Sequence, residues 1–107
     1  MNDKERVYHI FKHYDEMMQE IEILNNDETK SKDLLKKSIY MDLFQIGEHV
    51  NNLSDETKKK IEPRDLRGMV NIRNFIGHGY VVLDDSIIWD TISNDCPKLI
   101  NRLHELF

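Results

Sequence analysis

The amino-acid sequence predicts an all-α protein, folded as an antiparallel bundle of four to five helices in one domain, residues 1–107. Apolar residues recur at steps of three and four along most of the chain, which is the period of an α-helix. The 107 residues include only four glycines and two prolines, too few for the many turns of a β-sandwich or barrel. An alternating pattern long enough for a sheet is absent, since Tyr80–Leu83 is short and isolated.

An apolar stripe predicts the first helix, and Asn25-Asn26-Asp27 is expected to end it with a turn. Asn2 or Asp3 can cap its N-terminus, because a side-chain oxygen at that position accepts a hydrogen bond from an otherwise unpaired backbone N–H. The stripe consists of Val7, Ile10, Phe11, Tyr14, Met17, Met18, Ile21 and Leu24.

A second helix is predicted from about Thr29 to Leu53. Tyr40, Phe44 and Met41 give it a second apolar face, which predicts contacts with its own core and with a partner. Gly47 lies within this helix, where glycine costs up to about 1 kcal/mol relative to alanine, so we expect another helix to approach closely there. The main stripe consists of Leu34, Leu35, Ile39, Leu43, Ile46, Val50 and Leu53.

The second half of the chain contains clear signals for helix starts and ends. Ser54–Thr57 is typical of a capped helical turn. Pro63 suits the first position of a further helix, which we expect to end near Gly77–Gly79. A last helical segment is predicted after a cap at Asp84 or Asp85, and Pro97 should kink it or restart it.

Composition excludes several classes of protein. The net charge of −5 argues against a general nucleic-acid coat protein. No apolar run approaches the roughly 18 to 20 residues of a membrane span, and the N-terminus lacks the apolar segment of a signal peptide. The single Cys96 excludes an intramolecular disulfide and a multi-cysteine zinc site, and is expected in the core. We therefore expect a reduced, cytoplasmic location, with no membrane, metal or cofactor.

Residues 58–73 carry six basic and two acidic side chains. One interpretation is a solvated helix end. The other is an electrostatic binding site for the backbone of RNA. On that second interpretation the residues that attract RNA are Lys58, Lys59, Lys60, Arg64 and Arg67.

Most titratable residues have a structural explanation. His9 and His13 have the i, i+4 spacing of metal ligands, but no third ligand lies nearby in the sequence, so we expect structural surface histidines. His49 and His104 carry no functional signal. The acidic pairs Asp15-Glu16, Asp27-Glu28 and Asp84-Asp85 are expected to complement helix dipoles and aid solubility.

His78 differs because it follows the basic stretch, within Arg73-Asn74-Phe75-Ile76-Gly77-His78-Gly79-Tyr80. An arginine can hold a phosphate bidentately, and a histidine can move protons near neutral pH. Cleavage of RNA without a metal ion needs these two functions. A buried polar network at a helix end is the alternative.

Helix geometry complicates this assignment. Five residues of a straight helix turn about 500°, so Arg73 and His78 would lie about 140° apart, whereas Asn74 and His78 would share a face. We expect Gly77 and Gly79 to let the helix end distort and turn His78. A second copy of the site across a dimer axis would also help.

The spacing of Arg73, His78 and Tyr80 resembles the R-x4-H-x-Y motif of the HepT-like HEPN ribonucleases, the DUF86 family. Three segments strengthen the resemblance: Ile46-Gly47-Glu48 is similar to the family's "IGE", Asp85–Trp89 to its acidic-to-Trp segment, and Asn94–Leu99 to its "DxPxL" ending. Their order and separations fit over roughly residues 5–106. The chain departs from many members at three places. Pro63-Arg64 stands where Pro-Trp is common, and Val70-Asn71-Ile72 separates Gly68-Met69 from Arg73-Asn74, where the family commonly has none. Gly77 precedes the histidine where a larger apolar residue is common.

The resemblance implies a HEPN-type helical bundle, a homodimer, and metal-independent RNA cleavage by the toxin of a toxin–antitoxin pair. Arg73 and His78 would be the catalytic pair, with Asn74 beside the arginine. Tyr80 would be the site to which an MntA-type nucleotidyltransferase antitoxin transfers AMP, because bulk and negative charge near His78 would repel RNA. Glu48 would pair with Arg73 or serve as a structural contact.

Two other functions compete with the ribonuclease. The chain would be a non-catalytic helical module that binds a nucleotidyltransferase partner, which the net charge of −5 favours because an acidic protein binds RNA weakly unless its positive field is local. Alternatively, it would be a dimeric helical scaffold with Arg73 in a salt bridge at the interface.

Overall fold

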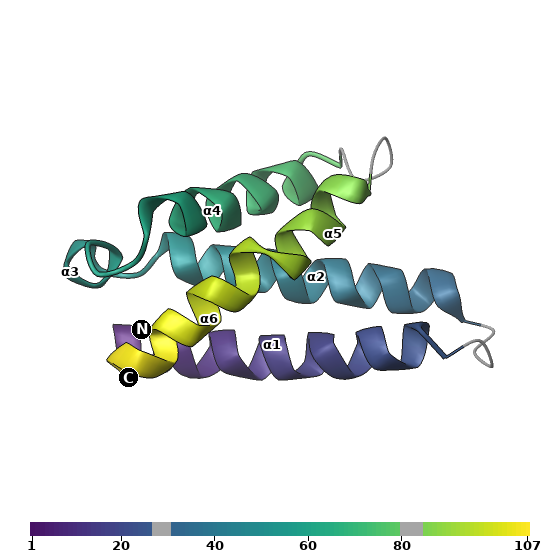
Figure 1. Cartoon of the computed structure of the whole chain (residues 1–107), viewed down its shortest axis with the longest axis horizontal. Helices are drawn as coiled ribbons and strands as arrows, with labels where there is room; N and C mark the ends of the chain where they lie inside the picture. Colours follow the sequence, from purple (N-terminus) through teal and green to yellow (C-terminus); the bar gives the residue numbers. More distant parts are fainter. Residues whose placement is uncertain (27–30, 80–84) are drawn as a thin grey trace.

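The chain folds into stacked helices, which the computed structural model describes for residues 1–26, 31–79 and 85–107 (Figure 1). Within those residues there is no strand, and no helix is long and apolar enough to cross a membrane. Five helices have eight or more residues and a sixth, α3, is a single turn, which confirms the predicted all-α bundle. The helices are α1 (Asp3–Leu24), α2 (Lys32–Asn51), α3 (Asp55–Lys58), α4 (Pro63–Gly77), α5 (Ser86–Ser93) and α6 (Asp95–Leu106).

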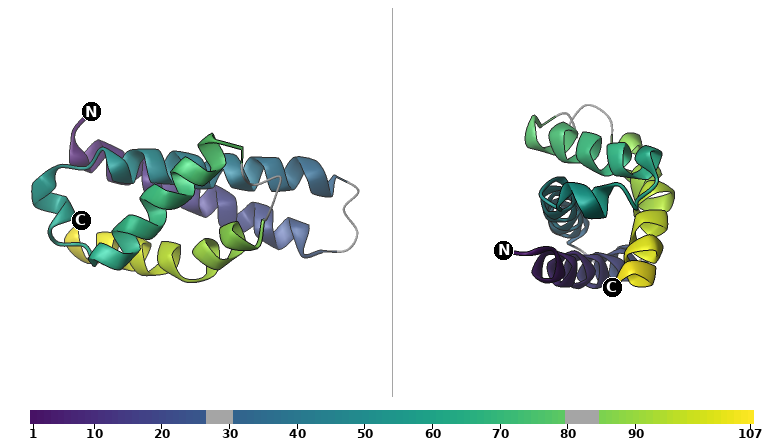
Figure 2. Two further views of the ribbon diagram at one scale, coloured as in Figure 1. Left: turned by 90° about the horizontal axis from the view of Figure 1, so that it is seen from above. Right: turned by 90° about the vertical axis from the view of Figure 1, so that its left-hand side faces the viewer.

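Helix α2 lies at the centre of the fold. It runs between α1 and α4, antiparallel to both, while α5 and α6 cover one side of the stack (Figures 1 and 2). The core is built from the apolar stripes, including Ile10, Leu43 and Leu103, which have no exposed surface. Cys96 is buried in the same core, as predicted. Leu34 is an exception to its stripe, because it lies in the first turn of α2 with 66% of its surface exposed.

The helix ends show how local signals set the connections. Asn2 caps α1 by accepting a hydrogen bond from Glu5 N at 2.9 Å, whereas Asp3 binds Ser54 and Thr57 of the α3 turn instead. Pro63 occupies the first turn of α4, as predicted. Pro97 lies in the first turn of α6, where its missing N–H costs nothing, so it restarts the helix rather than kinking it.

Gly47 confirms the predicted close approach of two helices. A Cβ atom at this position would lie 2.6 Å from Arg73 Cβ and 2.9 Å from the Met69 carbonyl oxygen. Backbone atoms of α4 therefore pack directly against α2, which no larger residue would allow. This contact positions Arg73 beside the next residue of α2, Glu48.

Candidate functional site

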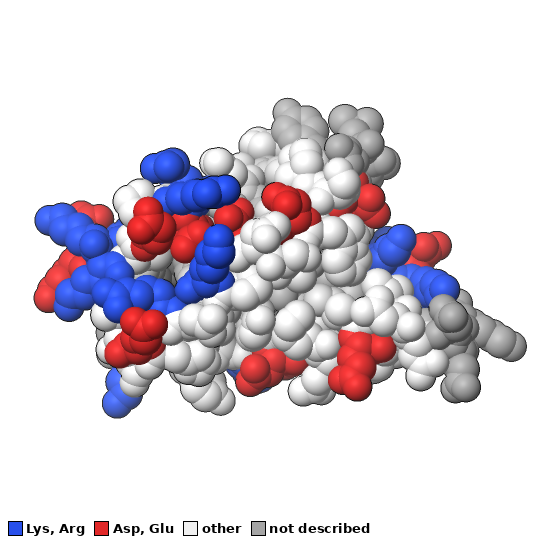
Figure 3. Space-filling model, in the orientation of Figure 1, with Lys and Arg blue, Asp and Glu red and all other residues white. Residues whose placement is uncertain are grey.

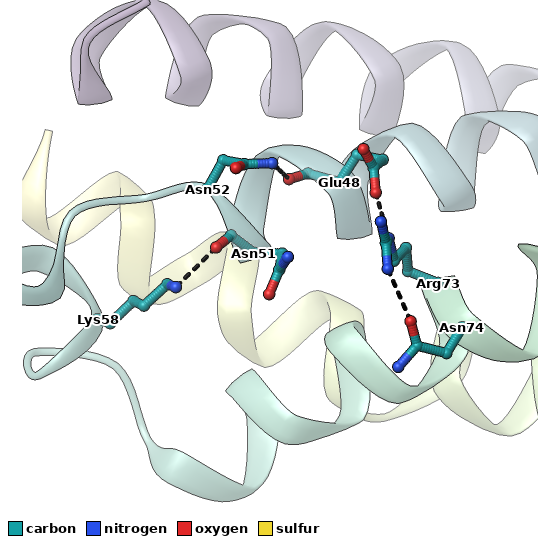
Figure 4. Close-up of polar contacts among 6 residues, drawn as sticks. All are labelled: Glu48, Asn51, Asn52, Lys58, Arg73 and Asn74. Atoms are coloured by element: carbon teal, nitrogen blue, oxygen red, sulfur yellow. Dashed lines mark hydrogen bonds and ion pairs between the residues drawn. The ribbon is translucent and has the colours of Figure 1, made fainter.

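Two side chains hold Arg73 in place, one through a carboxylate and one through an amide. Its Nε donates to Glu48 Oε1 from α2, and its Nη1 donates to the side-chain oxygen of Asn74 at 2.8 Å (Figure 4). The side chains of Arg73 and Glu48 are about one-third exposed, at 34% and 32%. The structure thus pairs Glu48 with Arg73, the first of the two roles expected for it. The pairing fixes the plane of the guanidinium group while part of that group remains accessible to solvent.

His78 leaves the path of the helix, as the neighbouring glycines predicted. Helix α4 ends at Gly77, and His78 has φ −91° and ψ 0°, followed by Gly79 with φ +76°. The backbone N–H of His78 still donates to Asn74 O at 3.0 Å, and that of Gly79 to Ile76 O at 3.0 Å. A left-handed residue after the last turn is the usual place for glycine at a helix end.

Arg73, Asn74 and His78 line one surface pocket of about 210 Å³ together with Phe44 and Gly77. The 140° separation expected on a straight helix therefore does not keep Arg73 and His78 apart. Phe44 comes from α2, and a Cβ atom at Gly77 would lie 3.3 Å from its Cε2, so a larger residue there would crowd the pocket. The pocket combines a fixed cation, an amide and an exposed imidazole, which suits a phosphate group and proton transfer beside it.

The basic residues lie at the opposite end of α4 from His78. Lysines and arginines gather over α3 and the start of α4 (Figure 3). Lys59 and Lys60 line one depression with Arg102, and Arg64 and Arg67 line another with Lys98, Asp90 and Asp95. At 1.5 Å per residue, Arg64 is about 20 Å from His78 along the helix axis. A ligand that contacts both the basic residues and His78 would therefore have to extend along the length of α4.

Lys58 has a local role. Its Nζ donates to the carbonyl oxygen of Asn51 at 2.6 Å, where α2 ends (Figure 4). A lysine at that position binds one of the carbonyls that the helix end leaves without a backbone partner. Tyr80, the expected site of AMP transfer, lies outside the described residues.

A second group of titratable side chains lies between α1 and α2, and the sequence did not reveal it. His13 Nδ1 lies 3.0 Å from Asp42 Oδ1, with Glu16 and Glu20 nearby on α1. Burial raises the pKa of Glu20 to about 7, and the adjacent Asp42 carboxyl adds to that shift. Burial also raises the pKa of Asp42. Asp42 is 29 residues from His13, so spacing within one helix could not identify it.

Two histidines without a functional signal in the sequence make ring contacts. His49 stacks on His9 with ring centroids 5.3 Å apart, and burial lowers the pKa of His49. His104 stacks on Phe11 with centroids 4.0 Å apart. His104 therefore has a packing role on the surface, whereas His49 belongs to a histidine cluster at the contact of α1 with α2.

Comparison with known proteins gives one consistent result. A family model described as "Ribonuclease HepT-like" matches residues 10–106. A protein of Methanocaldococcus jannaschii named "Putative RNase MJ0127" is 30% identical over 95 residues, covering 85% of this chain and 78% of the relative. A protein of Caldanaerobacter subterraneus subsp. tengcongensis named "Putative RNase TTE0752" is 24% identical over 98 residues, covering 92% and 88%. No solved structure matches the chain significantly.

Proposed function

The chain belongs to the HepT-like ribonuclease family, and we propose that it is a metal-independent endoribonuclease with its active site at Arg73 and His78. The observation that carries the proposal is the pocket that Arg73, Asn74 and His78 line together. An anchored guanidinium and an exposed imidazole at one pocket are the groups that a phosphodiester reaction needs when side chains alone supply the chemistry.

In the proposed reaction, Arg73 binds a non-bridging phosphate oxygen of RNA and stabilises the charge that develops on it. The 2′ oxygen attacks phosphorus, so that a 2′ O–P bond forms as the P–O5′ bond breaks. His78 takes the proton of the 2′ hydroxyl, or in its protonated form gives one to the leaving 5′ oxygen. A homodimer would bring a second His78 for the complementary transfer.

Substrate binding is proposed to extend from the pocket along α4. Lys59, Lys60, Arg64 and Arg67 would hold the RNA backbone away from His78, with Arg64 about 20 Å and Arg67 about 16 Å from it along the axis of α4. Lys58 is included in this surface, with one of its donors already bound to Asn51 O. A local basic surface allows RNA binding despite the net charge of −5.

We also propose a biological role, which rests on the motif resemblance. The protein would be the toxin of a toxin–antitoxin pair, and an MntA-type nucleotidyltransferase antitoxin would neutralise it by transferring AMP to Tyr80. Tyr80 follows His78 by two residues, so the added phosphate would repel RNA from the same pocket. Intact-mass measurement of the protein purified with and without such a partner tests this step.

The test of the reaction is cleavage of a labelled RNA, with EDTA, by tag-free protein whose intact mass shows no modification. We expect His78→Ala and Arg73→Ala each to lower the cleavage rate by at least about 100-fold. An RNA with a 2′-deoxy group at the cleaved position should resist the wild type. His104→Gln is the matched control, because His104 is an exposed histidine on α6 that should leave the rate unchanged.

Full cleavage by His78→Ala would contradict the assignment of that residue, and a requirement for a divalent metal would contradict metal independence. Absence of cleavage by folded, unmodified wild type would favour the non-catalytic module that binds a nucleotidyltransferase. That module would still bind its partner after Arg73→Ala.

A further inference from the structure

The side chains of His13, Glu16 and Asp42 come together between α1 and α2, on the side of α2 away from Arg73. We propose that these three residues bind a divalent transition-metal ion of the zinc class. One potential ligand atom from each of the three lies within 4.8 Å of the other two. His13 and Glu16 share one face of α1 because they are three residues apart, and Asp42 faces them from α2.

The buried carboxylate of Asp42 is the strongest argument for a cation. Only 8% of the surface of Asp42 is exposed. Its Oδ2 atom is inaccessible to solvent and has no N–H or hydroxyl donor among the described residues, so that the adjacent Glu20 carboxyl is its hydrogen-bonding neighbour. Burying a carboxylate costs free energy unless a hydrogen bond, a charge or a metal ion compensates it. The imidazole of His13 faces the carboxyl groups of Glu16, Glu20 and Asp42, so this region has more hydrogen-bond acceptors than donors.

The distances also suit a metal ion. Bonds of about 2.1 Å in a tetrahedral site place ligand atoms about 3.4 Å apart. His13 Nδ1 and Asp42 Oδ1 lie 3.0 Å apart, so a metal ion would take the place of the proton they share with little movement of either side chain. The side chain of Glu16 is exposed and can rotate to supply the third ligand atom. One imidazole and two carboxylates form a nitrogen and oxygen donor set of the kind that binds zinc, and water completes the coordination.

The neighbouring histidines form a competing donor set that geometry disfavours. The rings of His9 and His49 stack at an interplanar angle of 11°, so their faces, not their nitrogen lone pairs, point at each other. His13 is 6.3 Å from His49 between ring centroids, also in a stacked arrangement. A metal ion bound by His9 and His49 would require both rings to turn. The proposed ligand set therefore excludes them, and the experiment uses them as controls.

The proposed metal site is separate from the ribonuclease pocket. Asp42 faces α1 and Glu48 faces α4, and six residues of helix correspond to about 9 Å along the axis. A metal ion at His13 would tie α1 to α2 without contacting Arg73 or His78. We expect it to stabilise the fold without taking part in RNA cleavage, which the protein should still catalyse after EDTA has removed the metal, so this proposal and the proposed function fail or succeed independently.

The test is thermal unfolding and calorimetric titration of tag-free, metal-stripped full-length protein with Zn²⁺. We expect one Zn²⁺ per chain and a Tm increase on the order of 10 °C at a Zn²⁺ concentration about 100-fold above Kd. His13→Gln and Glu16→Gln should each weaken binding by at least about tenfold, in line with loss of a ligand. Both residues lie on the more accessible side of the site, so the variants should fold, which unfolding without metal would verify.

His9→Gln combined with His49→Gln is the matched control and should retain the Zn²⁺-dependent increase in Tm. Absence of a Zn²⁺-dependent shift in the wild type would overturn the proposal. Binding that persists in Glu16→Gln and His13→Gln, or that disappears in the His9 and His49 control, would also overturn it, because the ligands would then be other residues.

Discussion

The two faces of α2 carry similar ion pairs, but the polar groups left over after pairing differ between them. Toward α4, Glu48 pairs with Arg73, and the two side chains are 34% and 32% exposed, with His78 lining the same pocket as the arginine. Toward α1, Asp42 pairs with His13, and their side chains are 11% and 25% exposed, with Glu16 and Glu20 beside them. The first face keeps donors in excess and the second keeps carboxylate oxygens in excess.

The groups left over after pairing therefore indicate the class of ligand better than the ion pair itself does. An arginine fixed by one carboxylate still has N–H groups for an anion such as a phosphate. A buried carboxylate that has used one oxygen on a histidine still needs a cation or a proton on the other. The α4 face therefore suits RNA, and the α1 face suits a metal ion.

The largest effect is expected from filling the contact that holds Arg73 on its face. Gly47→Ala places a methyl group 2.6 Å from Arg73 Cβ and 2.9 Å from a backbone oxygen of α4. Neither atom can move unless the helices separate, so we expect a loss of about 2 kcal/mol in the free energy of unfolding and a Tm decrease of about 10 °C. Urea and thermal unfolding measure it.

Gly68→Ala is the matched control for Gly47→Ala. The three atoms nearest its new Cβ atom all belong to the side chain of Asp95, namely Oδ2, Cγ at 2.7 Å and Cβ at 3.0 Å, and that side chain can turn toward solvent. Alanine also has a higher helix propensity than glycine, by about 1 kcal/mol. We expect a change of less than about 1 kcal/mol. Equal losses in the two variants would show that the α2–α4 contact is not uniquely tight at Gly47.

The sequence was sufficient to predict helices wherever a signal was local. The stripes, the proline at the start of α4 and the interruption at Pro97, which was expected as a kink or a restart, depend on residues within one turn of each other. Gly47 also indicated a close contact, because an unfavourable residue within a helix needs a packing reason. The partner in that contact, α4, could not be predicted without the arrangement of helices in space.

The candidate sites were predictable only in part, for the same reason. Arg73 and His78 were selected by their chemistry and by resemblance, but their common pocket depends on where α4 stops, which periodicity alone places within a few residues. Asp42 and His49 were missed as neighbours of His13, because residues 29 and 36 positions away meet it only through the register of α1 against α2. The signal that could have indicated Asp42 is its position in the apolar stripe of α2, between Ile39 and Ile46, where an acidic residue needs a partner from another helix.

A smaller effect is expected when the partner of Arg73 is made neutral. Glu48→Gln keeps the shape of the side chain but removes its charge, so Arg73 is held less firmly, and we expect about a tenfold lower kcat for RNA cleavage. The decrease should disappear when Arg73→Ala is already present, because Glu48 acts through the arginine. Glu105→Gln, in the exposed pair with Arg102, is the matched control. Additive effects in the double variant would contradict a positioning role for Glu48.

The smallest effect on stability is expected at Asp3, because both oxygens of its carboxylate already accept hydrogen bonds. Its two oxygens accept hydrogen bonds from Ser54 N at 2.9 Å and from the hydroxyl groups of Ser54 and Thr57 at 2.5 Å. The hydroxyl hydrogen bonds hold the pKa of Asp3 below its ordinary value of 3.8. Because neutral donors satisfy both oxygens of this carboxylate, we expect Asp3 to stabilise the fold and to bind no ligand.

The pH dependence of unfolding tests that prediction for Asp3. A lowered pKa in the folded state means that the unfolded chain binds more protons, so the stabilisation is complete well above pH 3.8 and is lost as pH falls through the folded pKa. We expect Asp3→Asn to cost about 0.5 kcal/mol near neutral pH, a small value because the site is partly exposed, and less at about pH 3. Asp15→Asn, an exposed carboxylate of α1, should show no such convergence with the wild type. A penalty for Asp3→Asn that does not change with pH would mean that shape, not charge, holds the start of α1 against α3.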